Sequence, residues 1–272
     1  MNPAMHRDLL PLARRLAAEA GAFLLEGWML PRTSIETKST GTDMVSEMDR
    51  GAERLIVEGI IAARPDDAIL GEEGTERTGT SGVRWIVDPL DGTTNYLYGL
   101  PAWSVSIGIE VKAGAAVRTG ADADGVLHVG VVHAPALGDE YWGEAGTGAF
   151  RNGERIRVSG CNRVADALIA TGFGYAAAAR RSQGEIVARL LPQVRDLRRA
   201  GSAAIDLCWA ASGRVDAYFE SGCNPWDLAA GTLIMREAGG VVTDLHGGEP
   251  SKVMCIAAPE AIHAGLQALI VG

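Results

Sequence analysis

The chain has 272 residues, of which 47% are hydrophobic, and this content is ample for the core of one large domain or two small ones. Its net charge of −9 and isoelectric point near 5.1 argue against nonspecific binding to nucleic acid or to an anionic membrane. Because no run of 18 apolar residues occurs and charged residues interrupt the apolar N-terminal stretch, we expect a cytoplasmic protein without a membrane span.

The first part of the chain predicts two helices followed by strands. Apolar residues recur at helical spacing from about 6 to 28 and again from about 49 to 63, with Pro65 just beyond the second helix. Short apolar or alternating runs then indicate buried strands. These runs are 68–71, 83–88, 104–111 and 126–135.

A hairpin and a second group of elements complete the chain. Asn152-Gly153, between alternating apolar positions of 141–158, is typical of a two-residue hairpin turn. From about residue 160 the sequence predicts a basic amphipathic helix and then a helix that Ser202 can cap and Gly213 can end. A strand, a loop, another helix and a last strand follow.

No linker, repeat or low-complexity tract separates these two groups of elements. We therefore predict a single domain over 1–272, with an N-terminal lobe of about 1–158 and a C-terminal lobe of about 159–272. The mixture of helices and strands places the fold between the α/β and α+β classes, as two lobes of one compact unit.

Carboxylates follow apolar segments at three places. "DPLDGTTN" carries Asp88 and Asp91 at the end of a predicted strand, "GEE" carries Glu72 at the end of another, and "WDLAAG" carries Asp227 in the first turn of a helix. Each motif alone has a structural explanation as a turn, a cap or a solvated loop. Because α/β proteins build their sites where such elements end, we expect these four side chains to converge.

Four converging carboxylates require compensating positive charge. No histidine or cysteine adjoins the three motifs, and the four cysteines lie far apart without C-x-x-C spacing, so Mg²⁺ is favoured over zinc, and free thiols over disulfides. If a helix begins after Asp91, the amides of Gly92, Thr93 and Thr94 can bind a phosphate oxygen. Metal on one side and amides on the other suit the hydrolysis of a phosphate monoester by an activated water.

The three motifs, in this order, resemble those of the inositol monophosphatase family of magnesium-dependent, lithium-sensitive phosphatases. The likeness extends to "KSTGTDMVSEMD", "ATGFGY" and "RRAGSAAIDLCWAASGRVDAYFE", and so covers nearly the whole chain. It implies a layered α-β-α-β-α sandwich with mixed sheets, a homodimer, and two or three Mg²⁺ ions at each active site.

The resemblance also implies which residues hold the metals. Glu72, Asp88 and the carbonyl of Leu90 would hold the first ion. Asp88, Asp91 and Asp227 would hold the second, and a third, weaker ion would share Glu72.

The resemblance further implies roles in catalysis and in substrate binding. Thr93 would join Glu72 in orienting the attacking water, and Lys38 and Asp49 would support it. Met48 departs from the family pattern, in which threonine is common before this aspartate. The residues that would contact the inositol hydroxyls are Asp91, Ser202, Ala203, Glu220 and Asp227.

We predict that the protein hydrolyses inositol monophosphate to inositol and inorganic phosphate. Threonine rather than lysine after "DGT" favours this substrate over nucleotides and histidinol phosphate. Two alternatives stay open: a related phosphatase acting on fructose 1,6-bisphosphate or histidinol phosphate, and a regulatory partner of the transcription machinery. Arg195, Arg198 and Arg199 could belong to such a surface, although the acidic chain argues against direct nucleic-acid binding.

Other enzyme classes have little support in the sequence. "ATGFGYAA" loosely fits a dinucleotide-binding loop, but no clear βαβ unit encloses it. The motifs of P-loop proteins, serine hydrolases and zinc proteases do not occur.

Overall fold

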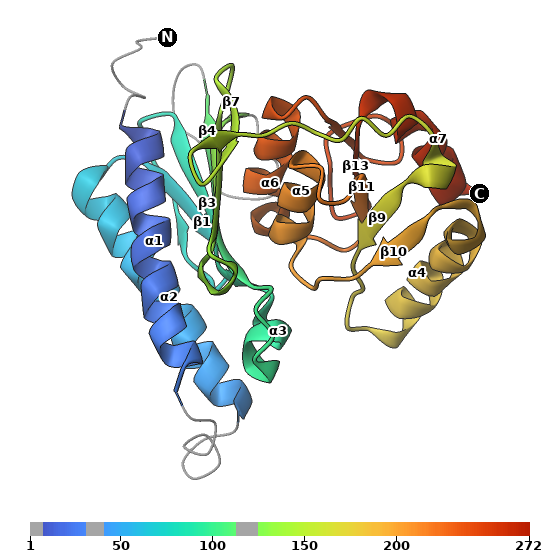
Figure 1. The fold of residues 1–272 in the computed structure, drawn as a ribbon. Coiled ribbons are helices and arrows are strands. Elements are labelled where there is room, and N and C mark those ends of the chain that lie inside the picture. Colours follow the sequence, from blue (N-terminus) through green and yellow to red (C-terminus); the bar gives the residue numbers. More distant parts are fainter. Residues whose placement is uncertain (1–7, 31–40, 113–124) are drawn as a thin grey trace.

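A computed structural model describes residues 8–30, 41–112 and 125–272 in five alternating layers (Figure 1). Two N-terminal helices cover one face of a large sheet, and two further helices lie between this sheet and a smaller one. The remaining long helices cover the outer face of the smaller sheet. The predicted α-β-α-β-α sandwich with mixed sheets is confirmed.

The outer layer of the N-terminal lobe consists of α1 (Leu9–Trp28) and α2 (Gly41–Ala63). The predicted start of the second helix, at residue 49, was wrong, because this helix begins at Gly41. Its first turns, "GTDMVSEM", are mostly polar, so the apolar periodicity that marks the helix begins only later. Within the ranges that the structure describes, no helix is long and apolar enough to cross a membrane.

The large sheet has eight strands in the order β2-β1-β3-β4-β5-β6-β7-β8, in which only β1 and β3 are parallel neighbours. The central strand β3 is buried along its whole length and continues to Asp91, beyond the predicted end at 88, after an irregularity between Asp88 and Asp91. Pro89 lies within this irregularity and has no N–H to donate to the neighbouring strand. The eight strands are β1 (Ala68–Gly71), β2 (Glu76–Arg77), β3 (Val83–Asp91), β4 (Ser104–Val111), β5 (Val126–Ala134), β6 (Asp139–Glu144), β7 (Gly148–Arg151) and β8 (Glu154–Arg155).

The smaller sheet has five strands in the order β10-β9-β11-β13-β12. Strand β9 is parallel to both of its neighbours, and the other pairs are antiparallel. Its outer face is covered by α4 (Ala177–Leu190) and α7 (Glu260–Val271) (Figure 1). The five strands are β9 (Leu168–Thr171), β10 (Asp196–Arg198), β11 (Ala217–Glu220), β12 (Val241–Thr243) and β13 (Cys255–Ala258).

The middle layer consists of α5 (Ala203–Ala211) and α6 (Pro225–Glu237). Glycines in the large sheet allow α6 to approach closely. A Cβ atom added at Gly108 would lie 2.6 Å from the Cβ of Ala229, and one added at Gly130 would lie 2.5 Å from the carbonyl oxygen of Ala230. The contact between α6 and the sheet therefore leaves no room for an extra methyl group.

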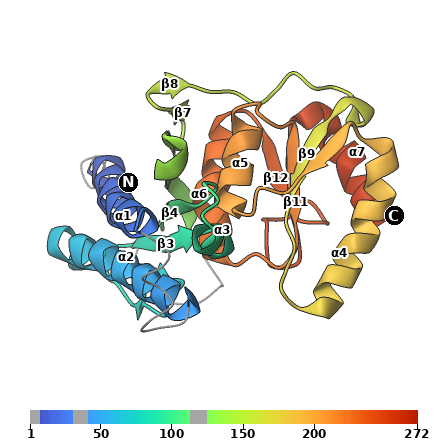
Figure 2. The ribbon, with the colours of Figure 1, turned by 60° about the horizontal axis from the view of Figure 1, so that its bottom comes forward.

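Two kinds of contact connect the lobes. A buried apolar cluster includes Val132 and Tyr141 of the large sheet together with Leu207 and Tyr218 of the C-terminal lobe. The short helix α3 (Thr93–Tyr98) lies where the lobes meet, as Figure 2 shows, and its Asn95 side chain donates a hydrogen bond of 2.8 Å to the carbonyl of Ala200. The site described next is built at this junction.

Candidate active site

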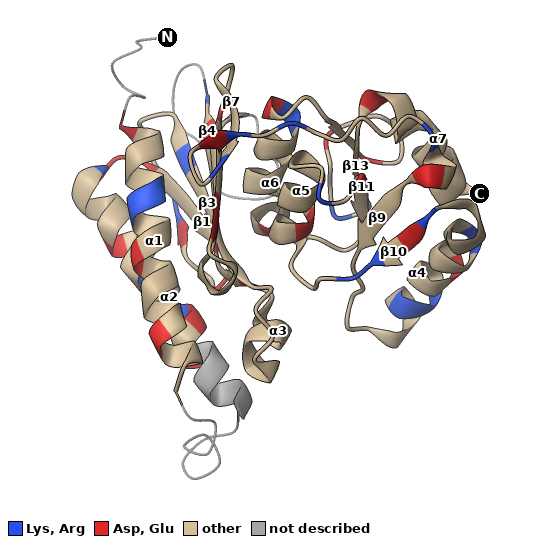
Figure 3. Ribbon diagram, in the orientation of Figure 1, with Lys and Arg blue, Asp and Glu red and all other residues tan. Residues whose placement is uncertain are grey.

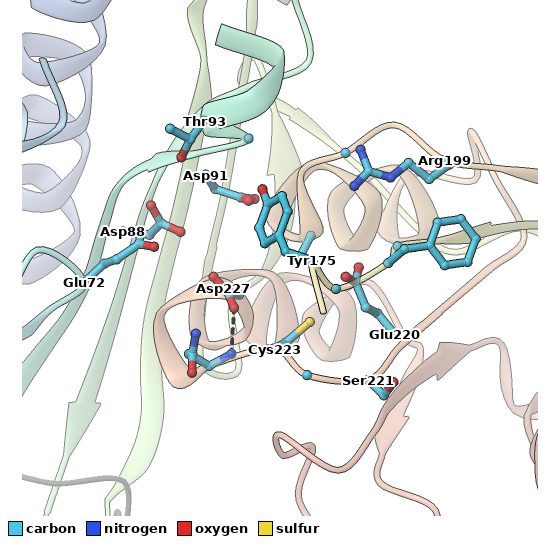
Figure 4. Close-up of a pocket in the computed structure, with 18 of the residues that line it drawn as sticks. Glu72, Asp88, Asp91, Thr93, Tyr175, Arg199, Glu220, Ser221, Cys223 and Asp227 are labelled. Carbon is cyan, nitrogen blue, oxygen red and sulfur yellow. Dashed lines mark hydrogen bonds between the residues drawn. The ribbon is translucent and has the colours of Figure 1, made fainter. Parts of the chain in front are cut away.

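Three acidic segments meet at the junction of the lobes (Figure 4). Single carboxylate oxygens of Asp88, Asp91 and Asp227 lie within 4.8 Å of one another. Together with Glu72, which directly follows β1, these residues line a cavity of about 200 Å³. The structure thus brings together the four carboxylates that the sequence predicts to converge.

The turn that follows Asp88 is fixed by its own hydrogen bonds. The Asp88 carboxylate accepts a bond of 3.0 Å from the N–H of Leu90, and the Thr93 hydroxyl donates one of 3.1 Å to the carbonyl of Leu90. Gly92 caps α3 with φ at +95°, in the left-handed region that glycine adopts at little cost. A helix does begin after Asp91, which is the condition for its amides to bind a phosphate, and Leu90, Gly92 and Thr93 all line the cavity.

Asp91 links the two lobes. Its carboxylate accepts a bond of 2.5 Å from the hydroxyl of Ser202 and one of 2.8 Å from the N–H of Ala204. The same hydroxyl accepts a bond from the N–H of Ile205, so Ser202 caps α5 as the sequence predicts. The donors at the N-terminus of α5 thus orient and partly stabilise a buried carboxylate.

Asp227 is held by a reciprocal capping arrangement at the start of α6. Its carboxylate accepts a bond of 2.6 Å from the N–H of Asn224, and the Asn224 side chain pairs in turn with the N–H of Asp227. Pro225 occupies the first helical turn, where a missing N–H costs nothing. This arrangement directs the Asp227 carboxylate toward the other acids (Figure 4).

Burial and mutual repulsion raise the pKa values of these carboxyl groups, so they ionise less readily than exposed ones. Burial, with the nearby charge of Asp227, raises the pKa of Asp91 to about 7. Burial likewise raises the pKa of Asp227 to about 7, although the Asn224 N–H opposes the shift. The pKa of Asp88 is raised well above its usual range by burial and then by Glu72, and that of Glu72 is raised by burial. These crowded carboxylate oxygens fit a hard divalent cation such as Mg²⁺. Cys223 also lines the cavity, but burial raises the pKa of its thiol well above the ordinary value, and it is the thiolate that binds metal.

The remaining predicted residues of the N-terminal segment have different outcomes. Asp49, on α2, is only 4% exposed, and burial followed by the charges of Glu72 and its neighbours raises its pKa to about 8. Lys38 lies outside the described residues. Met48 packs against α1, where a Cβ added at Gly27 would lie 2.2 Å from its methyl carbon, so the departure from the family pattern is accommodated by packing.

The opposite wall of the cavity comes from the C-terminal lobe. Ala203 and Glu220 line it, and burial raises the pKa of Glu220 to about 7 even though the Tyr218 hydroxyl donates a 3.0 Å bond to this carboxylate. Ser202, by contrast, is 1% exposed and lies behind Asp91. Thr94 is exposed, and its hydroxyl bonds to the Tyr175 hydroxyl at 3.1 Å.

The sequence analysis did not single out Tyr175, and it placed Arg199 on a possible partner surface rather than at the site. Both residues lie in loops and line this cavity, and Figure 4 shows the Tyr175 side chain pointing toward the acidic cluster. The "ATGFGY" segment, part of the family likeness, was the only sequence signal for Tyr175.

A larger cavity of about 760 Å³ lies on the other side of the Asn224 segment. Its lining is mainly apolar, and its acidic residues Glu110 and Glu249 are paired with Arg84 at 2.6 Å and with Arg236 at 3.0 Å. It contains none of the four converging carboxylates. The smaller, acidic cavity is therefore the candidate active site.

A five-layered sandwich with a cluster of carboxylates at the ends of its strands and helices fits one class of protein, the metal-dependent phosphatases. The chain matches the inositol monophosphatase family over residues 5–271, and it belongs to that family.

The proteins and structures similar to this chain include some named as inositol-1-monophosphatases and others named as Nus factors or extragenic suppressors. Inositol-1-monophosphatase SuhB of Mycobacterium tuberculosis is 39% identical over 271 residues, covering 92% of this chain and 89% of that protein. Nus factor SuhB of Escherichia coli is 38% identical over 246 residues, covering 90% and 87%. The crystal structure of extragenic suppressor protein suhB from Bartonella henselae superposes with a TM-score of 0.82 at 35% identity, covering 97% of this chain and 99% of that one.

Proposed function

We propose that this protein hydrolyses inositol monophosphate to inositol and inorganic phosphate, with Mg²⁺ as cofactor. The observation that carries the proposal is the convergence of Glu72, Asp88, Asp91 and Asp227 at one cavity in a chain of this family. When bound, Mg²⁺ supplies Lewis-acid polarisation of the phosphoryl oxygens and offsets the charge that develops on the leaving group. Everything else in the mechanism depends on side chains and amides of the chain.

The proposed ligand sets follow the family pattern. Glu72, Asp88 and the carbonyl of Leu90 would hold one ion, and Asp88, Asp91 and Asp227 a second. A third, weaker ion would share Glu72. The crowding of these oxygens and the raised pKa values of the acids support a site built for divalent cations.

Residues beside the proposed ligands would hold the attacking water and the phosphate. Thr93 and Glu72 would orient the water, with Asp49 and Lys38 in support, and the Thr93 hydroxyl lies beside the carbonyl of Leu90. The first N–H groups of a helix have no partners within it, so the amides of Gly92, Thr93 and Thr94 would bind phosphate oxygens.

The substrate's polyol would occupy the wall formed by the C-terminal lobe. Glu220 and Ala203 line the cavity and would contact its hydroxyls together with Asp91 and Asp227. Ser202 would contribute to this contact through Asp91, because its hydroxyl is bound to that carboxylate. Several hydrogen-bonding groups around a small cavity favour a compact polyhydroxylated leaving group.

Phosphate release from a panel of monoesters tests the proposal. Inositol monophosphate, glycerol 2-phosphate, fructose 1,6-bisphosphate and histidinol phosphate are each offered with Mg²⁺ or with EDTA. We expect saturable turnover of inositol monophosphate that EDTA abolishes and added Mg²⁺ restores. Full turnover in EDTA would contradict the metal requirement, and a higher kcat/KM for another ester would favour the related sugar-phosphate phosphatase.

The relatives named Nus factor SuhB support a second candidate function, a regulatory partner of the transcription machinery. Of the three arginines that could form such a surface, Arg195 and Arg198 are exposed at β10, whereas Arg199 lines the acidic cavity. The basic residues of α4 and β10 offer a surface for an acidic protein partner (Figure 3). Pull-down of transcription components by the purified protein, combined with no turnover of any ester in the panel, would favour this function over the enzyme.

We further propose a homodimer of single-domain subunits in the cytoplasm. Tyr98 and Leu100, at the C-terminal end of α3, are 67% and 53% exposed. Exposed apolar side chains gathered in this way are typical of an interface. Light scattering after size-exclusion chromatography would contradict the dimer if it gave the 28.5 kDa mass of one chain, and cell fractionation tests the location.

Lithium inhibition is a further part of the proposal. Lithium carries one charge where Mg²⁺ carries two, and it would replace the ion held by Asp88, Asp91 and Asp227 after the ester is cleaved. Because the inhibitor would then trap bound product, inhibition should be uncompetitive with inositol monophosphate. Competitive inhibition in a lithium titration at several substrate concentrations would contradict trapping.

A further inference from the structure

Glu53, on α2, has no part in the site described so far, yet its carboxylate is bound to the turn that carries Glu72. One oxygen accepts a bond of 2.8 Å from the N–H of Glu73. The other accepts bonds of 3.2 Å from the N–H of Thr75 and 2.6 Å from the Thr75 hydroxyl. Glu53 is only 4% exposed, and three donors offset the cost of burying its charge.

The same carboxylate also packs against the residue that precedes Glu72. A Cβ added at Gly71 would lie 2.4 Å from a Glu53 oxygen, so a side chain at position 71 and a carboxylate at position 53 exclude each other. The N–H of Glu72 itself donates a 3.1 Å bond to the carbonyl of Val87 on β3. The backbone around Glu72 therefore contacts β3 on one side and the Glu53 carboxylate on the other. Val87 directly precedes Asp88 in the sequence.

These contacts give Glu72 a fixed place relative to Asp88. One side of the turn is anchored to β3 by the bond to Val87, and the other is anchored to α2 by Glu53. Asp49 lies four residues before Glu53, so one face of α2 presents both side chains to the site. Loss of the Glu53 carboxylate would leave the turn held to α2 by the ion pair between Arg50 and Glu73, whose atoms are 3.9 Å apart.

We propose that Glu53 is a positioning residue, which sets the place of the Glu72 carboxylate and thereby the affinity of the site for a divalent cation. The inference rests on the proposed function, in which Glu72 is a metal ligand. Groups that orient a ligand in this way typically change metal affinity by about 10- to 100-fold when they are altered.

Glu53→Gln is the most informative substitution at this position. It keeps the shape of the side chain but replaces one acceptor oxygen by an NH₂ donor, and all three partners on the turn are themselves donors. Thr75→Val removes one of the three bonds while keeping the N–H that makes another. Glu58→Gln is the matched control, because Glu58 is an exposed residue of the same helix.

Binding of Mn²⁺, followed by loss of the electron paramagnetic resonance signal of the free ion, provides a readout that does not depend on turnover. Mn²⁺ accepts the same oxygen ligands as Mg²⁺. We expect Glu53→Gln to weaken Mn²⁺ binding about tenfold or more, Thr75→Val to weaken it by a smaller factor, and Glu58→Gln to leave it unchanged. Wild-type affinity in both Glu53→Gln and Thr75→Val would overturn the proposal.

A double-mutant cycle separates positioning from a general structural role. If Glu53 acts through Glu72, Glu53→Gln should cause no further loss of Mn²⁺ affinity in a Glu72→Gln background. An equal loss in both backgrounds would overturn the proposal. Urea unfolding of each variant verifies that it is folded, and if Glu53→Gln does not fold, the cycle is made with Thr75→Val instead.

The outcome for the proposed function is distinguishable from the outcome for Glu53. A wild-type protein that binds Mn²⁺ and shows the expected cycle but hydrolyses no ester would support the positioning role and reject the phosphatase. If the wild type turns over inositol monophosphate and the variants bind Mn²⁺ as tightly as the wild type does, the phosphatase is supported and the positioning role is rejected.

Discussion

Removing divalent cations should make the stability of this protein depend strongly on pH. In the metal-free folded state, burial and repulsion raise the pKa values of Asp91 and Asp227 to about 7, against the ordinary value of 3.8 that they regain on unfolding. Between these two pH values the folded chain retains protons that the unfolded chain has lost. The free energy of unfolding should therefore fall as pH rises from about 4 to about 7 and then level off.

The size of this loss follows from the two pKa values. A difference from 3.8 to about 7 corresponds to roughly 4 kcal/mol for either group considered alone. The two contributions overlap, because the charge of Asp227 is one cause of the raised pKa of Asp91. We therefore expect the metal-free stability at pH 8 to be lower than at pH 4 by on the order of 4 kcal/mol, a large part of the roughly 5–15 kcal/mol typical of a folded domain.

Urea unfolding followed by tryptophan fluorescence measures this effect, and six tryptophans supply the signal. Curves are recorded at pH 5 and pH 8, each in EDTA and in saturating Mg²⁺. The cation binds the ionised carboxylates, so its stabilisation should be greater at pH 8, and a concentration 100-fold above Kd would contribute about 2.7 kcal/mol. The stabilisation by Mg²⁺ at pH 8 is compared with that at pH 5. In this difference, the contributions of groups that do not interact with the cation cancel.

Asp91→Asn is the control for this reasoning. The variant keeps the shape of the side chain but removes one of the repelling charges, so in EDTA at pH 8 it should be more stable than the wild type. A wild type that is equally stable in EDTA at both pH values, or an Asp91→Asn protein that is no more stable than it, would refute the argument from repulsion.

Three further predictions concern single substitutions. Asp91→Asn should lower kcat for inositol monophosphate more than tenfold, a loss above about 1.4 kcal/mol, and phosphate release measures it. Gly92→Ala should destabilise the fold by about 1–3 kcal/mol in urea unfolding, because φ is +95° and the new Cβ would lie 2.8 Å from the carbonyl oxygen of Ala102. Asp139→Ala should cost about 2 kcal/mol or more, since the buried carboxylate pairs with Arg214 at 2.7 Å and also with a second arginine; a midpoint shift no larger than that of Glu58→Gln would contradict it.

Local sequence patterns were sufficient for most of the secondary structure. The alternating run 104–111 is a strand with the predicted bounds, and Asn152 and Gly153 both adopt positive φ, at 49° and 84°, as a tight hairpin requires. The start of α2 and the extension of β3 to Asp91 were missed, because neither a polar first turn nor an irregular strand end has an apolar period. The predicted element order was also wrong in stopping at a last strand, because β13 and α7 follow β12.

The acids of the site could be expected to meet because each stands at the end of a regular element. Residues that act on the site through other residues could not be expected from local sequence patterns. Glu53 contacts a turn 20 residues further along the chain, and Tyr175 bonds to a residue 81 positions away, so both contacts depend on the packing of whole elements. The spacing of Asp49 and Glu53 on one helix face was the only local sign of the first contact.

The close approach of α6 to the large sheet has a consequence for the kinetics of cofactor loading. Asp227 is carried by a helix that Gly108 and Gly130 allow to lie directly against the sheet that carries Asp88 and Asp91, so sterically rigid packing, rather than the ion, holds these acids near one another. A site of this kind is preorganised, so the binding of an ion does not depend on a slow movement of these acids. The slow step of Mg²⁺ entry should then be the shedding of water from the ion itself, which Mg²⁺ does reluctantly. Ions that exchange their hydration water faster should accordingly load faster, in the order of their water-exchange rates rather than of their affinities.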